Sequence, residues 1–180
     1  MRSGAVGPTR TLPNTVRDLS DEAFAQTRFL RRVVLPTCLE TIGVRAFSRS
    51  DLQRVLVPGG VRRISAQAFA GAASLRSVEF ESGSVLAEVG DEAFAETAIF
   101  DLSLPGSLRA LKPGVLAGMG RLWGVRLGEG LEVLESRCFS GTSVKQVQLP
   151  ASLRKIESGA FSGCPGLWSV RVPSGSMHVN

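Results

Sequence analysis

The feature that most constrains this chain is an internal repeat of about 23 residues. Apolar–proline pairs such as Leu35-Pro36 and Leu149-Pro150 recur along it, and with Phe80 and Leu127 as equivalents that lack the proline, neighbouring markers lie 22 to 24 residues apart. A second marker, Ala-Phe or a close substitute, keeps step with the first over seven units. A period of 20–50 residues is the signature of stacked-repeat architectures. The structural unit to be predicted is therefore the single repeat and its stacking, not the chain of 180 residues as a whole.

The apolar residues within each unit predict its local structure. Leu39, Ile42 and Phe47 are separated by three and then five residues, and this spacing holds in all seven units. The segment before each proline, such as Val33 to Leu35, has a core of β-branched residues. The proline that follows has no N–H to donate to a neighbouring strand, so the pattern predicts one short strand per repeat. The stretch around Ala-Phe is too short for an independent helix, so a helical or 3-10 turn packed by its Phe is expected.

One unit of this size cannot bury its own Leu, Ile and Phe side chains. Units stacked at roughly 4.8 Å per strand would share a continuous apolar interior. We therefore predict an α/β repeat fold, a right-handed solenoid of about seven repeats of 22–25 residues, with a short parallel strand and short helical or 3-10 turns in each. The expected boundaries are a flexible lead over residues 1–10, the solenoid over 11–173 and a tail over 174–180.

The full repeat pattern resembles a known family. The segment from Leu149 to Cys164 matches Leu-Pro-x-x-Leu-x-x-Ile-x-x-x-Ala-Phe-x-x-Cys almost throughout, and this pattern is similar to the BspA-type leucine-rich repeats. The resemblance covers residues 12–173. It implies a non-catalytic module that binds protein or glycan, with a role in adhesion as a surface or secreted protein. The alternative is an intracellular scaffold for protein interactions.

The ninth repeat position departs from the general leucine-rich pattern. Where that signature has Asn or Cys to bond turn backbone, this chain has mostly Thr, Ser or Gly, and an Asn ladder is absent. Hydroxyl side chains are expected to cap some of the turns, while glycines only let the backbone bend. The residues at this position are Thr15, Cys38, Gly60, Ser107, Gly130 and Ser152.

The inventory of reactive side chains argues against catalysis. The one histidine, His178, lies in the expected tail. Cys138 and Cys164 occupy positions that small residues fill in other repeats, and Cys38 lies at a turn without a partner base. The three cysteines lack the spacing of a metal site, and the glycines recur in phase with the turns. We expect no enzymatic activity, no catalytic residues, no metal and no cofactor.

The charge pattern bears on partners. Residues 1–78 carry a net charge of +7, residues 79–101 carry −7 and residues 102–180 carry +5. An acidic segment between basic ends argues against a continuous cationic track, so no nucleic acid is expected. No run approaches the roughly 18 apolar residues of a membrane helix, so no membrane insertion is expected. The start does not resemble a signal peptide, which leaves location open between the cell surface and the cytoplasm.

In-register stacking aligns equivalent residues in columns, and the non-core strand positions form the surface that a ligand would meet. Both tryptophans fall in one such column, and Trp and Arg are enriched where binding energy concentrates. The alternative is that the aromatic rings fold over neighbouring repeats, with Lys145 between two indoles. The predicted ligand-binding residues are Arg31, Arg54, Arg76, Phe100, Trp123, Arg126, Lys145, Trp168 and Arg171.

The two ends of a repeat stack expose core and strand edges unless they are covered. The last expected strand, residues 168–172, is followed only by Pro173 and seven small or polar residues. Three explanations stay open: a longer array, pairing of one end with a second copy, or a proline that is sufficient to stop edge growth. Association of two copies of the chain through the ends of the stack is accordingly one of the interactions to be tested.

Overall fold

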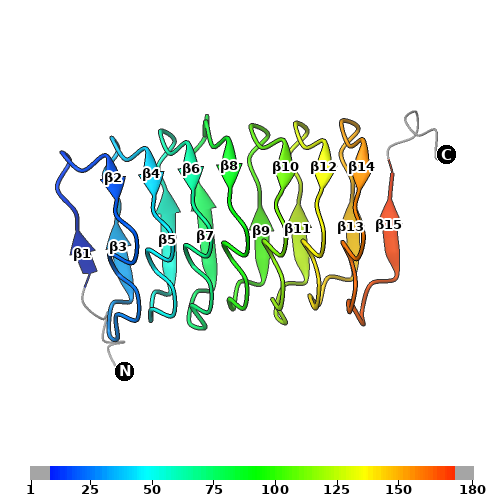
Figure 1. Ribbon diagram of the computed structural model, residues 1–180, viewed down its shortest axis with the longest axis horizontal. Coiled ribbons are helices and arrows are strands. Elements are labelled where there is room, and N and C mark those ends of the chain that lie inside the picture. Colours follow the sequence, from blue (N-terminus) through cyan, green and yellow to red (C-terminus); the bar gives the residue numbers. More distant parts are fainter. Residues whose placement is uncertain (1–8, 173–180) are drawn as a thin grey trace, which may run out of the picture.

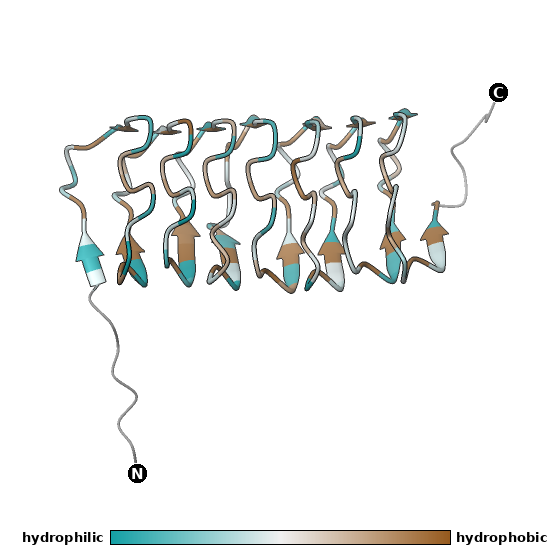
Figure 2. Cartoon of the chain, turned by 60° about the horizontal axis from the view of Figure 1, so that its bottom comes forward, coloured by the Kyte–Doolittle hydropathy of each residue, from teal (hydrophilic) through white to brown (hydrophobic). Residues whose placement is uncertain are grey.

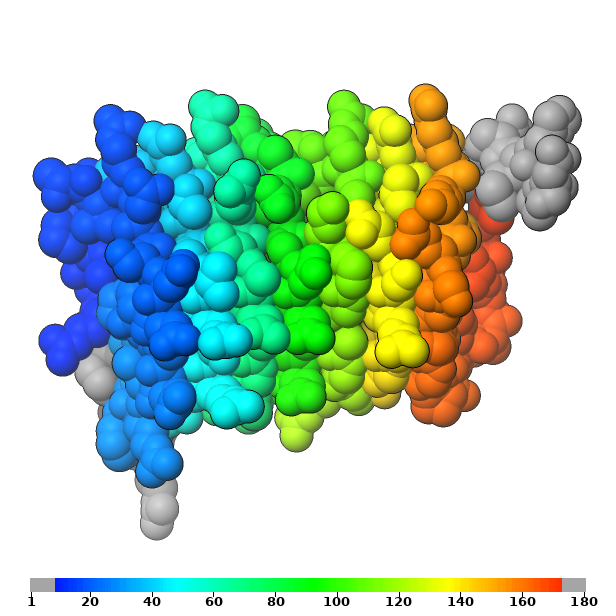
Figure 3. Space-filling model, in the orientation of Figure 1, coloured from blue at the N-terminus to red at the C-terminus, as the bar shows by residue number. Residues whose placement is uncertain are grey.

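The computed structural model describes residues 9–172, which wind into a stack of seven rungs with one repeat in each (Figure 1). Successive rungs follow one another as bands along the long axis (Figure 3). Each rung has a two-residue strand, a turn around Ala-Phe or its substitute, and a longer strand. The short strands are β2 (Asp18–Leu19), β4 (Thr41–Ile42), β6 (Arg63–Ile64), β8 (Glu88–Val89), β10 (Ala110–Leu111), β12 (Val133–Leu134) and β14 (Lys155–Ile156).

The longer strands form a second row, which lies below the short strands in Figure 1 and belongs to separate sheets. The first of them, β1, precedes rung one and begins two residues before the solenoid boundary expected from the sequence. They are β1 (Thr9–Thr11), β3 (Arg32–Val34), β5 (Arg54–Val57), β7 (Ser77–Phe80), β9 (Asp101–Ser103), β11 (Gly124–Arg126), β13 (Gln146–Gln148) and β15 (Ser169–Arg171).

All strand pairs are parallel and join equivalent residues, such as Val55 with Val78. The short strands form the sheets β2-β4-β6-β8 and β10-β12-β14, and the longer strands form β1-β3-β5-β7, β9-β11 and β13-β15. The predicted parallel solenoid is confirmed. The prediction of one strand per repeat is too low, because two-residue strands such as Thr41–Ile42 are too short to give a period-two signal.

The expected helical turns are wrong in their detail. Residues 9–172 contain no helix, and the Ala-Phe segments form hydrogen-bonded turns instead. In rung two, Arg45 and Arg49 have φ angles of 53° and 52°, a left-handed conformation that a right-handed helix cannot contain. The backbone N–H of Phe47 donates to the carbonyl of Ala68 in the next rung at 2.7 Å. The turn backbone therefore bonds between rungs, as the strands do.

The phenylalanines of the turns form the centre of the core. The rings of Phe24, Phe47, Phe69 and Phe94 stack at centroid distances of 5.2, 5.3 and 5.3 Å in nearly parallel planes. Leu116 takes the equivalent place in rung five, and a further stack of Phe139 on Phe161 follows in rungs six and seven. Apolar residues recur at equivalent places in every rung (Figure 2). The predicted continuous apolar interior is confirmed, and we call the column of turn phenylalanines with Leu116 the phenylalanine spine.

Two of the ninth-position residues cap turns through their side chains. The Ser152 hydroxyl donates to the carbonyl of Leu131 at 2.7 Å, and the Cys38 thiol donates to that of Asn14. The buried hydroxyl of Ser107 has no partner in the described structure.

The last rung is less covered than the inner ones. Ile156 is 43% exposed, whereas Ile64, its equivalent in an inner rung, is fully buried. Val170 is likewise 41% exposed, whereas Val78 is buried. Self-association through this end stays a prediction.

Close approach between rungs fixes some glycines, which gives a first prediction. A Cβ on Gly90 would lie 2.5 Å from the backbone N of Ala66 and 2.9 Å from the carbonyl carbon of Ser65, and backbone atoms cannot move aside. We expect Gly90→Ala to lower the free energy of unfolding by about 2 kcal/mol, measured by urea denaturation. Gly120→Ala is the control, because a Cβ there meets nothing within 4 Å. Equal effects of the two changes would contradict the rung spacing.

Candidate recognition surface

The outward side chains of the longer strands, with the residue just before each strand, form one continuous surface that we call the strand face. In β5, Val55 and Val57 point into the core, while Arg54 and Leu56 are exposed. This alternation follows from the pleat of a strand. Every residue predicted for ligand binding lies on the strand face and is exposed: Arg31, Arg54, Arg76, Phe100, Trp123, Arg126, Lys145, Trp168 and Arg171.

The aromatic side chains of the strand face do not pack on one another. Phe100 is 48% exposed, Trp123 58% and Trp168 69%. Within the described chain, all stacked ring pairs belong to the phenylalanine spine, and none includes Phe100, Trp123 or Trp168. The interpretation in which these rings cover neighbouring rungs stays the alternative, and the W123A/W168A variant described below tests it. The exposed apolar surface of the three rings is available to a ligand.

A groove of about 400 Å³ crosses the strand face where the ladder of longer strands is interrupted between β7 and β9. Strand pairing stops there, in the rung that carries two extra residues after Phe80. Three of the predicted residues, Arg76, Phe100 and Arg126, line the groove together. The other lining residues are Ser77, Val78, Glu79, Phe80, Asp101 and Ser103.

Arg126 is held in place at one side of this groove. Its guanidinium donates to the Ser103 hydroxyl at 2.9 Å and lies 3.6 Å from a carboxylate oxygen of Asp101. A Cβ on Gly124 would lie 2.6 Å from the other oxygen of Asp101, so glycine leaves room for that carboxylate. Asp101 and Gly124 were not among the predicted site residues. The two residues occupy equivalent positions, one before the central apolar residue of their strands, and this shared column could have indicated that they are neighbours.

The remaining predicted residues are not gathered into a pocket. Arg31 and Arg54 lie toward the first rungs, and Arg171 lies on the last strand. No ion pair joins the side chains of Arg31, Arg54 or Arg76 to an acid within residues 9–172. The strand face therefore runs from a cationic part, through the groove and its aromatic residues, to Trp168 near the last rung.

The described residues hold little that supports other chemistry. No group of three or more His, Cys, Asp or Glu side chains in the described part of the chain is arranged to hold a metal ion. His178 lies outside the described residues. The part of the chain that the structure describes has no helix long and apolar enough to cross a membrane.

The thiol of Cys138 gives a prediction about alkaline pH. Burial raises the pKa of this thiol to about 12 from an ordinary value of 9.0. The folded chain therefore keeps a proton that the unfolded chain loses, so stability is full below pH 9 and falls as the pH rises toward 12. In the linear range, ΔG of unfolding loses about 1.4 kcal/mol per pH unit through this group.

The matched control for this prediction is Cys138→Ala, because alanine fills the same position in most other rungs. Urea denaturation between pH 9 and 11 is expected to show a steeper loss of stability for the wild type than for the variant. Parallel curves would show that Cys138 is not buried as described.

Comparison with known proteins places this fold in a class. Repeats of about 23 residues that stack parallel strands around a shared apolar spine define a leucine-rich-repeat solenoid. A family model for the BspA type leucine rich repeat region matches residues 8–122 and 116–179, in six copies. The chain belongs to this BspA-type leucine-rich repeat family. No curated protein matches it.

Solved structures of bacterial repeat proteins share the fold. A leucine-rich repeat protein from Eubacterium ventriosum has a TM-score of 0.79 at 21% identity, covering 97% of this chain and 47% of its own. The leucine-rich repeat protein of T. pallidum has a TM-score of 0.71 at 25% identity, covering 93% and 71%. A leucine rich cell surface protein from Faecalibacterium prausnitzii has a TM-score of 0.51 at 19% identity, covering 93% and 60%. This chain thus spans only about half of the first of these proteins.

Proposed function

We propose that this chain is a non-catalytic recognition module whose strand face binds a protein or glycan ligand. The observation that carries the proposal is the exposure of three aromatic rings, Phe100, Trp123 and Trp168, on one face, none of which stacks on another ring in the described structure. An exposed aromatic side chain offers a large apolar area that a partner can bury, so a group of them marks a binding surface. The Arg126–Asp101 pair beside these rings supplies directional polar contacts.

The rigidity of the fold supports such a role. The strand face is carried on strands whose positions are set by the buried spine, so a ligand meets side chains that are already in place. A preformed surface loses less conformational entropy on binding than one that must be ordered. The family is typically non-catalytic. We further propose that the chain acts in adhesion at a cell surface, since the similar F. prausnitzii protein is described as a cell surface protein.

The two tryptophans give a direct test, because the sequence contains no others and both lie on the strand face. A panel of glycans and extracellular matrix proteins is screened by calorimetry for saturable binding. Each ligand found is then tested for protection of the tryptophan fluorescence from iodide quenching. We expect quenching to fall on binding. A saturable ligand that leaves the quenching unchanged would place recognition on another surface.

A further inference from the structure

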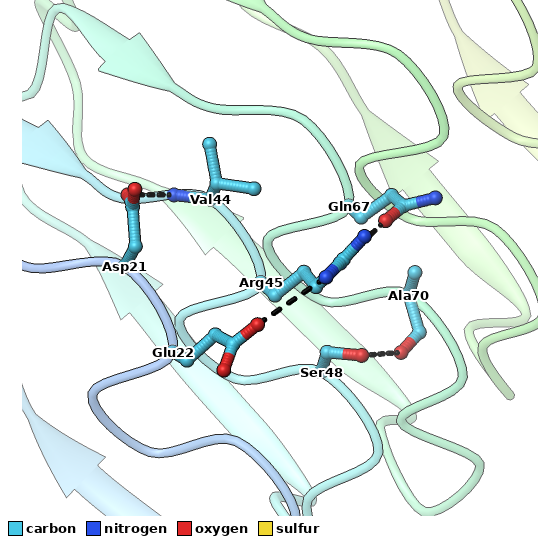
Figure 4. A network of polar contacts seen from close by, with 7 residues as sticks. All are labelled: Asp21, Glu22, Val44, Arg45, Ser48, Gln67 and Ala70. Carbon is cyan, nitrogen blue, oxygen red and sulfur yellow. Dashed lines mark hydrogen bonds and ion pairs between the residues drawn. The ribbon is translucent and has the colours of Figure 1, made fainter.

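A second surface, which we call the turn trough, runs along the Ala-Phe turns and their equivalent in the first five rungs. It is a hollow of about 480 Å³ between two rows of mostly longer side chains. Figure 4 shows the contacts among Glu22, Arg45 and Gln67 of one row. The floor between the rows is made only of small side chains: Ala25, Ser48, Ala70, Ala95 and Ala117.

The rows occupy the positions two before and two after each spine residue, where the backbone is left-handed throughout. Glycine adopts this conformation without the steric cost that other residues carry. In rungs five to seven, glycine indeed takes five of the six positions. In rungs one to four, seven of the eight positions carry Glu, Gln or Arg instead. Long polar side chains are thus concentrated where they border the trough, against the preference of the backbone.

The side chains of the first row bond to one another. Arg45 lies 3.3 Å from a carboxylate oxygen of Glu22, and its Nε donates to Gln67 Oε1 at 2.8 Å (Figure 4). The Gln67 amide in turn donates to Glu92 Oε2 at 2.7 Å. This chain of contacts neutralises Arg45 and makes a continuous polar wall.

The second row leaves two opposite charges without partners. The side chains of Arg49 and Glu96 make no hydrogen bond or ion pair with other described residues. Gly71 lies between them, and Arg49 Cγ is 3.1 Å from where a Cβ on Gly71 would be. Two rungs at strand spacing separate the two residues by about 10 Å. The trough therefore presents a cation and an anion on backbone positions two rungs apart along its axis.

The floor offers no free backbone edge. The N–H of Gln26 donates to the carbonyl of Ser48, and the N–H of Gly71 donates to that of Ala95. A β-strand could not be added here, because adding a strand requires unpaired backbone groups. A polyproline II segment needs no backbone partners and has three residues per turn at 3.1 Å each. Its side chains three residues apart thus lie on one side, about 9 Å apart.

We propose that the turn trough binds a polyproline II segment of a partner protein that carries an acidic and a basic side chain three residues apart. The acid pairs with Arg49 and the base with Glu96, and the small floor residues admit the segment between the rows. A nucleic acid backbone is disfavoured because the carboxylates of Glu92 and Glu96 repel phosphate. This site is separate from the strand face, so it does not depend on the function proposed above.

The probe is a capped hexapeptide of prolines with Glu and Lys three residues apart, made in both orders and titrated at low salt, where charge pairing is least screened. We expect saturable binding of at least one order, with NMR shifts in the amides of Ser48 and Ala70. The R49Q/E96Q double variant keeps the shape of the trough and is expected to bind at least about tenfold more weakly. A hexapeptide with adjacent Glu and Lys is expected to bind no better to the wild type than to this variant.

A steric variant separates occupancy of the trough from general charge attraction. Ala70→Phe fills the floor and is expected to abolish binding, whereas Ser162→Phe makes a similar enlargement in the same column at rung seven, outside the trough, and leaves binding unchanged. Circular dichroism confirms that each variant is folded. No saturable binding to the wild type, equal binding by R49Q/E96Q, or equal binding of the adjacent-charge peptide would overturn the proposal. The W123A/W168A variant is expected to bind the peptide normally, whatever the outcome at the strand face.

Discussion

Replacing Phe69 by alanine is expected to lower the free energy of unfolding by about 3–5 kcal/mol. Phe69 is fully buried and its ring stacks between those of Phe47 and Phe94. Its removal leaves a cavity that the neighbouring rungs cannot fill, because their backbones are hydrogen-bonded to each other. Urea denaturation followed by circular dichroism measures the change.

Two further variants keep this prediction interpretable. Phe69→Leu is expected to cost much less than Phe69→Ala, because Leu116 already fills the equivalent spine position in rung five. Phe29→Ala is expected to change stability by less than about 0.5 kcal/mol, because Phe29 is largely exposed. A loss below about 1 kcal/mol for Phe69→Ala would mean that the ring is not part of a dry spine.

The double variant W123A/W168A is expected to lose binding to a strand-face ligand by on the order of 100-fold or more. Tryptophans that act as anchors contribute about 2 kcal/mol or more each, and a factor of ten corresponds to about 1.4 kcal/mol. Both indoles are more than half exposed, so the variant loses little packing within the fold. Calorimetry against a ligand from the panel measures the affinity.

The control for this loss is Val85→Ala. Val85 is an exposed apolar residue, as the two tryptophans are, with 48% of its surface exposed. It lies outside the longer strands, in the rung with the two extra residues. We expect it to leave both binding and far-ultraviolet circular dichroism unchanged. Unfolding of W123A/W168A would instead show that the indoles support the stack, which is the packing alternative.

The spacing of apolar residues was sufficient to predict the main features of the fold. The period, the parallel stack and the buried positions of Phe47 and Phe69 follow from residues that can only be buried if the units pile up. The exposure of Trp123 and Trp168 follows from the same register, because it places them outside the apolar positions. These features depend on residue type at a fixed spacing, which a single sequence displays.

The turns could not be predicted in the same way. The residue types of Glu22 and Arg45 disfavour a left-handed backbone, yet both adopt it, with φ angles of 58° and 53°. The conformation is imposed by N–H groups that must reach carbonyls of the next rung. Such a demand arises between repeats, and in rungs one to four, where seven of the eight positions are not glycine, residue type does not indicate it. The turn trough, whose rows depend on this backbone, was therefore not visible in the sequence.

The groove on the strand face was hidden for a related reason. The two extra residues after Phe80 were evident, but nothing in them indicates that pairing of β7 with β9 would stop. The pairing of Asp101 with Arg126 depends on the space above Gly124, which is a property of adjacent rungs. Site geometry therefore needed the structure, although three of its residues were predicted.

The measurement that tests the central claim most directly is an NMR titration of the isotope-labelled chain with the first panel ligand that binds saturably. The two indole N–H signals report Trp123 and Trp168 separately, and backbone amides report every other surface. The account predicts that both indole signals shift together with amides around Phe100 and Arg126. Shifts confined to the Ala-Phe turns or to the last rung, with both indole signals unmoved, would contradict recognition by the strand face.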